Sequence, residues 1–239
     1  MPNPTAAMLV IGDEILSGRT HDTNTHYLAG VLTEAGIDLR EARVVSDNAA
    51  AIIGAVQTLA ARYDHVFTSG GIGPTHDDIT ADAVAQAMGR KIDVREDARE
   101  ILAAHYKKVG IELNAARLRM ARIPDGARLI DNPVSAAPGF VLGNVHVMAG
   151  VPGIFKAMVA SVVPALTGGA PLLSRSMDVD RGEGDIAAPL AELAARFPAL
   201  SFGSYPYQRQ GAYGTNVVAR GQDAGVLDAA LAEMQDLFG

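Results

Sequence analysis

The sequence contains no cysteine and no tryptophan, and aromatic residues make up only 5% of its 239 residues. Without cysteine the chain has no disulfide scaffold, no thiolate zinc site and no cysteine-held iron–sulfur cluster. The formal net charge of −7 disfavours binding to a nucleic-acid backbone. No apolar run approaches the roughly 20 residues of a membrane span, so we expect neither nucleic acid nor membrane as a partner.

The lack of cysteine also fits a reducing compartment. The first residues, MPNPT, have no basic start before an apolar core, so they do not have the pattern of a signal peptide. We therefore expect a cytoplasmic protein.

Small aliphatic residues dominate the apolar 49% of the chain, as expected where helices cover a parallel sheet. Continuous apolar runs at 7–11 and 64–67, and a strand pattern at 38–45, alternate with helical patterns that begin near Asn24, Asn48 and Asp77. This alternation predicts an α/β fold with a doubly wound, mostly parallel sheet.

The segment 167–171 (TGGAP) is the best candidate for a domain boundary. We expect an α/β domain over 1–168 and a small α+β subdomain over 169–239 with the order βαββα. Residues 211–214 (GAYG) have the outline of a backbone-clamping Gly-x-x-Gly loop. They lie between two predicted strands in an acidic segment, which favours a plain hairpin turn.

The most informative stretch is 68–80 (TSGGIGPTHDDIT), a glycine-rich turn between a strand and a helix. Glycines allow a ligand to approach the backbone closely, and a helix N-terminus favours an anion. The adjacent carboxylates Asp77 and Asp78 would repel a phosphate unless a divalent cation lies between them. Capping of the helix by Asp77 or Thr80 is the structural alternative.

Ligands of open parallel sheets bind at the carboxyl ends of the strands. That edge is expected to gather Asp13 and Glu14 after the first strand, the amide Asn24, the glycine turn, and Lys156 beyond the segment 150–153 (GVPG). Hard oxygen ligands favour Mg²⁺, Mn²⁺ or a similar divalent ion, and an ammonium offsets charge on a phosphoryl group. Capping by Asp13 and an ordinary surface location of Lys156 remain open.

Six segments resemble, in order, the molybdopterin-binding-like fold, and more closely the amino-terminal part of the competence/damage-inducible CinA proteins. The hydrolase domain of eukaryotic FAD synthases is similar too. The matching segments are GDEILSG (12–18), DTN (22–24), SGGIGPTHDDIT (69–80), NP (132–133), APGF (137–140) and GVP (150–152). Residues 202–206 (FGSYP) also look like that family's second small domain.

The resemblance implies a divalent-metal-dependent pyrophosphatase that splits ADP-ribose, or a related dinucleotide such as FAD, into AMP and a sugar phosphate or FMN. It also implies Co²⁺ as a favoured ion, beside Mg²⁺ or Mn²⁺. It implies Glu14, Asp78 and Lys156 as catalytic residues and Glu14, Asp77 and Asp78 as metal ligands. The expected substrate-binding residues are Gly12, Asp13, Ser17, Asn24, Ser69, Gly70, Gly71, Gly73, Pro74, Thr75, Thr80, Gly150 and Pro152.

A pterin-binding or adenylyl-transfer protein of molybdenum cofactor synthesis is the alternative that the same fold implies. Relatives form dimers or trimers, so a homo-oligomer is expected. The family commonly has a glutamate where this chain has Ile154, a departure that weakens any role for the segment around it. The family's further carboxy-terminal deamidase domain has no counterpart in this sequence, so that activity is not expected.

Overall fold

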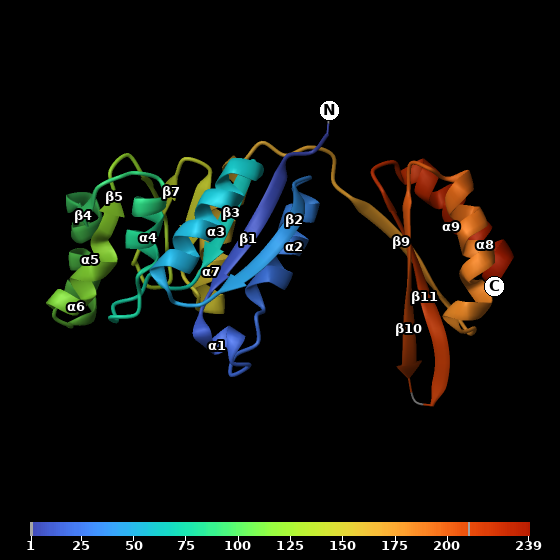
Figure 1. Ribbon diagram of the computed structural model, residues 1–239, viewed down its shortest axis with the longest axis horizontal. Coiled ribbons are helices and arrows are strands. Elements are labelled where there is room, and N and C mark those ends of the chain that lie inside the picture. Colours follow the sequence, from blue (N-terminus) through green and yellow to red (C-terminus); the bar gives the residue numbers. More distant parts are fainter. Residues whose placement is uncertain (1, 210) are drawn as a thin grey trace. The chain divides into compact units, whose positions relative to one another are not determined.

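The computed structural model describes residues 2–209 and 211–239. Its internal contacts divide the chain into two compact units, Met1–Gly169 and Ala170–Gly239. The first unit has two hydrophobic cores, a six-stranded sheet and a two-stranded sheet, and the second has one core and a three-stranded sheet (Figure 1). The two are described separately below.

The larger unit is built on a six-stranded sheet. Its strands, in spatial order, are β2 (Asp38–Val45), β1 (Thr5–Ile11), β3 (His65–Ser69), β8 (Val145–Met148), β7 (Gly139–Leu142) and β6 (Arg128–Ile130). The first four are parallel to their neighbours, whereas β7 and β6 continue the sheet in antiparallel pairs. The expected α/β fold with a mostly parallel sheet is therefore confirmed.

Side chains alternate across β1, which explains why its sequence is apolar throughout. Ala7, Leu9 and Ile11 belong to the core beneath α3, α4 and α5, while Ala6, Met8 and Val10 belong to the core beneath α2 and α7. The α-helices described in this unit are α1 (Asp13–Leu16), α2 (Asn24–Glu34), α3 (Ala49–Arg62), α4 (Thr80–Ala87), α5 (Glu96–Val109), α6 (Ala115–Leu118) and α7 (Pro152–Val162). Helices thus cover both faces of the sheet, as in a doubly wound fold.

The start of α4 is the main correction to the expected elements. The helix begins at Thr80 rather than near Asp77, and its N-cap position, Ile79, makes no side-chain capping bond. Asp77 and Asp78 therefore lie in the turn before the helix, and neither Asp77 nor Thr80 caps it. The N–H of Thr80 donates to the carbonyl of Gly71 at 3.0 Å, so the turn itself determines where the helix starts.

The smaller unit is an α+β fold, as expected. Its elements are β9 (Leu173–Val179), α8 (Glu183–Arg196), β10 (Ser201–Arg209), β11 (Ala212–Gly221) and α9 (Ala224–Phe238). The strands form an antiparallel sheet in the order β10-β11-β9. Gly214 lies inside β11, paired with Tyr207, so 211–214 is not a Gly-x-x-Gly loop.

Candidate active site

The candidate active site is a cavity of about 550 Å³ at the edge where β1, β3 and β8 end, hereafter the main cavity. Parallel neighbours bring the ends of these strands together: Val10 pairs with Ser69, and Ser69 pairs with Met148. The lining residues are Ile11, Glu14, Arg19, Thr20, Asp47, Gly70, Gly71, Ile72, Gly73, Pro74, Asp77, Asp78, Met120, Asn132, Ser135, Ala137, Ala149, Gly150, Val151, Pro152 and Ile154. This volume lies within the usual range for small-molecule sites.

Two glycines of the turn are required by close backbone approaches. A Cβ on Gly70, whose φ is +112°, would lie 2.1 Å from the carbonyl oxygen of Ile11. A Cβ on Gly71, at φ +68°, would lie 2.1 Å from Oγ1 of Thr80. Because only glycine fits both the conformation and the space, the chain can pass tightly from β3 over the end of β1. Backbone rather than side chains therefore forms this wall of the cavity.

Asp47 lies near three other carboxylates on the acidic side of the cavity. Oδ2 of Asp47 accepts the backbone N–H of Asp13 at 2.9 Å. Burial raises the pKa of Asp47, and the nearby negative charges of Asp13, Glu14 and Asp77 raise it further. This mutual repulsion is what a bound cation would relieve.

Asp78 is held in place by its own turn. Its Oδ2 accepts both the backbone N–H of Thr75, at 2.8 Å, and the Thr75 hydroxyl, at 2.5 Å. These bonds fix one carboxylate oxygen. Thr75, which was expected to bind substrate, therefore positions the Asp78 carboxylate.

A loop over residues 131–137 forms another wall and is organised by Asn132. This side chain is only 3% exposed. Its Nδ2 donates to Oγ of Ser135 and the carbonyl of Ala137, and its Oδ1 accepts the N–H groups of Val134 and Ser135. All four hydrogen-bonding positions of the amide are thus filled inside the loop, and its role here is to shape the wall.

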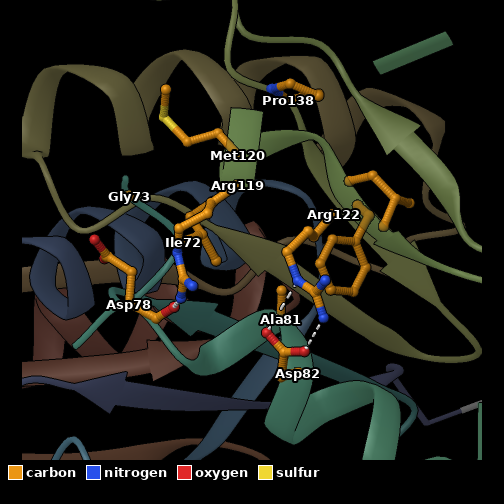
Figure 2. A pocket seen from close by; sticks show the side chains of 12 residues that line it. Ile72, Gly73, Asp78, Ala81, Asp82, Arg119, Met120, Arg122 and Pro138 are labelled. Carbon is orange, nitrogen blue, oxygen red and sulfur yellow. Dashed lines mark hydrogen bonds and ion pairs between the residues drawn. The ribbon is translucent and has the colours of Figure 1, made fainter. Parts of the chain in front are cut away.

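Figure 2 shows a smaller pocket that is lined in part by the glycine turn. Its volume is about 20 Å³. Within it Nη2 of Arg122 and Oδ1 of Asp82 form an ion pair at 2.5 Å, which ties β5 (Arg122–Pro124) to α4. Arg119 lies beside Asp78, with Nη2 3.4 Å from the carbonyl oxygen of that residue. Asp78 lines both this pocket and the main cavity.

A third cavity, of about 50 Å³, opens beside the main cavity and is hereafter the side recess. The two share several lining residues: Ile11, Glu14, Thr20, Gly150 and Pro152. Asn24 and Ser69 line the recess and not the main cavity.

Nine residues expected in the site line the main cavity. They are Glu14, Gly70, Gly71, Gly73, Pro74, Asp77, Asp78, Gly150 and Pro152. Six others, Gly12, Asp13, Ser17, Thr75, Thr80 and Lys156, line neither the main cavity nor the recess. Thr80 is buried beneath Gly71, and Gly12 is buried at the end of β1.

Lys156 lies on the exposed side of α7. Its ammonium is 5.1 Å from the centre of the Tyr27 ring, a cation–π contact. Among the described residues lining the main cavity, Arg19 is the one with a cationic side chain. Sequence reasoning missed Arg19 and also Asp47, although Asp47 follows β2 at the same edge and the strand-end rule could have found it.

The donors around the main cavity suit a hard divalent cation. The residues described include no group of three His, Cys, Asp or Glu side chains already arranged as a metal site. The carboxylates of Glu14, Asp77 and Asp78 nevertheless line one cavity, and carboxylates combined with substrate phosphate oxygens are a usual environment for Mg²⁺. The charge crowding at Asp47 fits such an ion.

Over residues 2–209 and 211–239, none of the helices combines the length and the apolar character needed to cross a bilayer.

Comparison with known families identifies the fold. The profile described as "Probable molybdopterin binding domain" matches residues 7–168. The chain belongs to this family, in its CinA-like branch. The profile described as "FAD synthase, middle domain" matches residues 171–239, so each unit has a family counterpart.

Individual relatives agree with this placement. A "CinA-like protein" of Citrifermentans bemidjiense is 41% identical over 68% of this chain and 40% of its own length. A "Probable FAD synthase" of Caenorhabditis elegans is 31% identical over 98% of this chain and 50% of its own. The chain thus spans half or less of these two relatives. A solved structure of CinA from Thermoplasma acidophilum, described as of unknown function, is 38% identical, with a TM-score of 0.61 over 67% of this chain and 96% of its own.

Proposed function

We propose that the protein is a divalent-metal-dependent hydrolase that splits the pyrophosphate bond of ADP-ribose or a related dinucleotide such as FAD. The observation that carries this proposal is the main cavity itself, in which a glycine-walled turn and the carboxylates of Glu14, Asp47, Asp77 and Asp78 share one space. An anion site crowded with carboxylates requires a cation as the mediator. The resemblance of the second unit to an FAD synthase domain supports a nucleotide substrate.

In this proposal Glu14 and Asp78 hold the ion, and Asp13 and Asp77 assist. A bound Co²⁺, Mg²⁺ or Mn²⁺ would polarise the phosphoryl oxygens. The backbone of the turn 70–75 binds the diphosphate, and a carboxylate orients the attacking water. The water oxygen bonds to one phosphorus as the bond from that phosphorus to the bridging oxygen breaks, and the proton that the water loses passes to the carboxylate that orients it. The other half leaves as a monophosphate that carries the bridging oxygen, so ADP-ribose gives AMP and ribose 5-phosphate, and FAD gives AMP and FMN.

The direct experiment is turnover of ADP-ribose and FAD with each metal, with products separated by chromatography. Glu14→Gln and Asp78→Asn are each expected to lower kcat at least about 100-fold, since each removes a charge that holds the ion. Glu34→Gln, an exposed carboxylate on α2, is the matched control. Wild-type rates in both site variants, with folding intact, would refute the assignment.

The family description favours one other function, molybdopterin binding, and adenylyl transfer is the reaction that would accompany it. It predicts that the protein binds a pterin phosphate tightly and leaves ADP-ribose and FAD uncleaved. The same chromatographic assay, run beside a pterin-binding titration, separates the two functions.

A further inference from the structure

The side recess contains a buried amide whose orientation is fixed by its neighbours. Asn24 is 5% exposed, and its Nδ2 donates to the carbonyl oxygen of Gly150 and to Oγ of Ser69, both at 2.8 Å. A carbonyl oxygen accepts only, so the nitrogen of the amide must face Gly150. Oδ1 of Asn24 is buried and makes no hydrogen bond in the structure.

A buried amide oxygen without a partner is costly, on the order of 1–3 kcal/mol. The groups that can satisfy it are hydrogen-bond donors or cations. Ser69, 3% exposed, complements it: its Oγ already accepts from Asn24, so the Ser69 hydroxyl hydrogen can be donated to a second group. Asn24 and Ser69 both line the recess, so this acceptor and this donor lie beside the same space.

Charge excludes a phosphate from the recess. Glu14 and Asp22 line it, and no lysine or arginine is among its described lining residues. Oδ1 of Asp22 accepts the N–H groups of Asn24 and Thr25 at 3.0 and 3.1 Å, so this carboxylate is oriented by the start of α2. An anion entering here would meet Asp22, a negative charge that the ion proposed between Glu14 and Asp78 does not hold.

Size excludes a large group. A cavity of about 50 Å³ exceeds the roughly 30 Å³ that a water molecule occupies in the liquid, but it does not admit a nucleobase. The divalent ion of the proposed function is assigned to Glu14 and Asp78 at the main cavity, which leaves the recess for an uncharged group. What fits is a small neutral group that both donates and accepts a hydrogen bond.

We propose that the side recess binds a sugar hydroxyl of the substrate. The hydroxyl donates to Oδ1 of Asn24 and accepts from Ser69. Because the recess shares Glu14, Gly150 and Pro152 with the main cavity, a ribose attached to a diphosphate in that cavity can reach it. The inference rests on the proposed function for its substrate class, and it makes the enzyme selective for ribose over deoxyribose.

The test compares ligands that differ by one hydroxyl. Sites built to hydrogen-bond a hydroxyl reject analogues that lack it by up to about 10⁴-fold. In kcat/KM measurements on ADP-ribose and its singly deoxygenated analogues, at least one analogue is expected to lose about 100-fold or more. If every analogue is cleaved within about threefold of the parent, a difference below roughly 1 kcal/mol, hydrolysis stands and the recess proposal fails.

A second arm needs no hydrolysis. Calorimetry compares AMP with 2′-deoxy- and 3′-deoxy-AMP, and ribose 5-phosphate with its 2-deoxy analogue, in the presence of Mg²⁺. Discrimination here without turnover of any dinucleotide would support the recess while refuting the proposed hydrolase. Equal binding of every pair, or binding of none, would overturn the recess.

Ser69→Ala supplies the protein-side control. It removes the donor while keeping the size of the side chain close, and it is expected to reduce the preference for the hydroxylated ligand toward unity. Ser161→Ala, an exposed serine on α7 that donates to the carbonyl of Ala157, should keep the full preference. A Ser69→Ala protein that melts like the wild type and still discriminates fully would contradict the proposal.

Discussion

At the scale of single residues, Asp47 shows that carboxylates repel one another in the metal-free site. Its carboxylate accepts from Asp13 and faces the charges of Asp13, Glu14 and Asp77. Asp47→Asn keeps an oxygen for the Asp13 N–H and removes one charge, so the metal-free variant should melt at a higher temperature than the wild type. Thermal unfolding in EDTA measures this, and addition of Co²⁺ should stabilise the wild type more than the variant. A lower melting temperature of the variant would show that repulsion at Asp47 does not destabilise the metal-free protein.

A second question at this scale is which cationic side chain would lie beside a bound phosphate. Arg19 lines the main cavity, whereas the ammonium of Lys156 lies over Tyr27. We expect Arg19→Ala to lower kcat/KM by at least about tenfold, or roughly 1.4 kcal/mol, and Lys156→Ala to lower it less. The catalytic role that the family resemblance implies for Lys156 stays a prediction. A larger loss in Lys156→Ala than in Arg19→Ala would favour it.

His146 gives the pH dependence of stability. Burial, together with the neighbouring His65 and Arg128, lowers the pKa of His146 from 6.5 to about 3, and its ring stacks on Phe67 at 4.7 Å. In the unfolded chain the His146 imidazole therefore binds a proton near pH 6.5, whereas in the folded chain it binds one only near pH 3. This neutral imidazole contributes stability above pH 6.5, and that contribution is lost as the pH falls toward 3.

His146→Phe removes this titration and keeps an aromatic ring on Phe67. Between pH 7 and pH 4 its free energy of unfolding should fall less than that of the wild type, as measured by urea titration at each pH. His76→Gln, at a fully exposed turn residue, is the control and should follow the wild type. If the free energy of unfolding falls equally with pH in all three proteins, His146 is not the source of the pH dependence.

At the scale of elements, the periodic patterns of the sequence were strong enough to predict the strands that form the site. The strand expected at 38–45 is β2 as observed, and the hairpin expected around Gly143 is β7 and β8. The three-residue strands β4 (Ile92–Val94) and β5 could not be found, because such short segments carry no period. The start of α4 was misplaced because acids before a helix resemble caps, although here they serve the turn.

The same limit applies to the candidate site. Glu14 and Asp78 could be assigned to one edge because parallel strands must end together. The orientation of the Lys156 side chain and the location of Arg19 at the main cavity depend on packing between distant segments, which spacing along the chain does not encode.

The loop 131–137 supports a prediction at this scale. Asn132 fills four hydrogen bonds inside it, and Ala136 has φ +61°. Asn132→Ala should destabilise the protein by about 2–4 kcal/mol because buried donors and acceptors lose their partner. Ala136→Gly should be neutral or stabilising by up to about 1 kcal/mol, since glycine adopts this conformation without strain. Urea unfolding measures both, and a destabilised Ala136→Gly protein would contradict the strain argument.

At the scale of the whole molecule, both candidate cavities are confined to one unit. Every residue that lines the main cavity or the side recess belongs to Met1–Gly169. That unit has two hydrophobic cores of its own, one on each face of the six-stranded sheet. Its oligomeric state stays a prediction of a dimer or trimer, which light scattering of the full chain measures.

This confinement makes a prediction about the second unit. A protein of residues 1–169 should fold and hydrolyse ADP-ribose with a kcat/KM within about threefold of the full chain, a difference of roughly 0.7 kcal/mol. Circular dichroism establishes that the shortened protein is folded before its rates are compared. Because no cavity residue is removed, a folded but inactive 1–169 protein would show that Ala170–Gly239 supplies part of the substrate contact. The Asp78→Asn variant of the shortened protein is the control, and its inactivity would tie any remaining turnover to the same carboxylate in both lengths of chain.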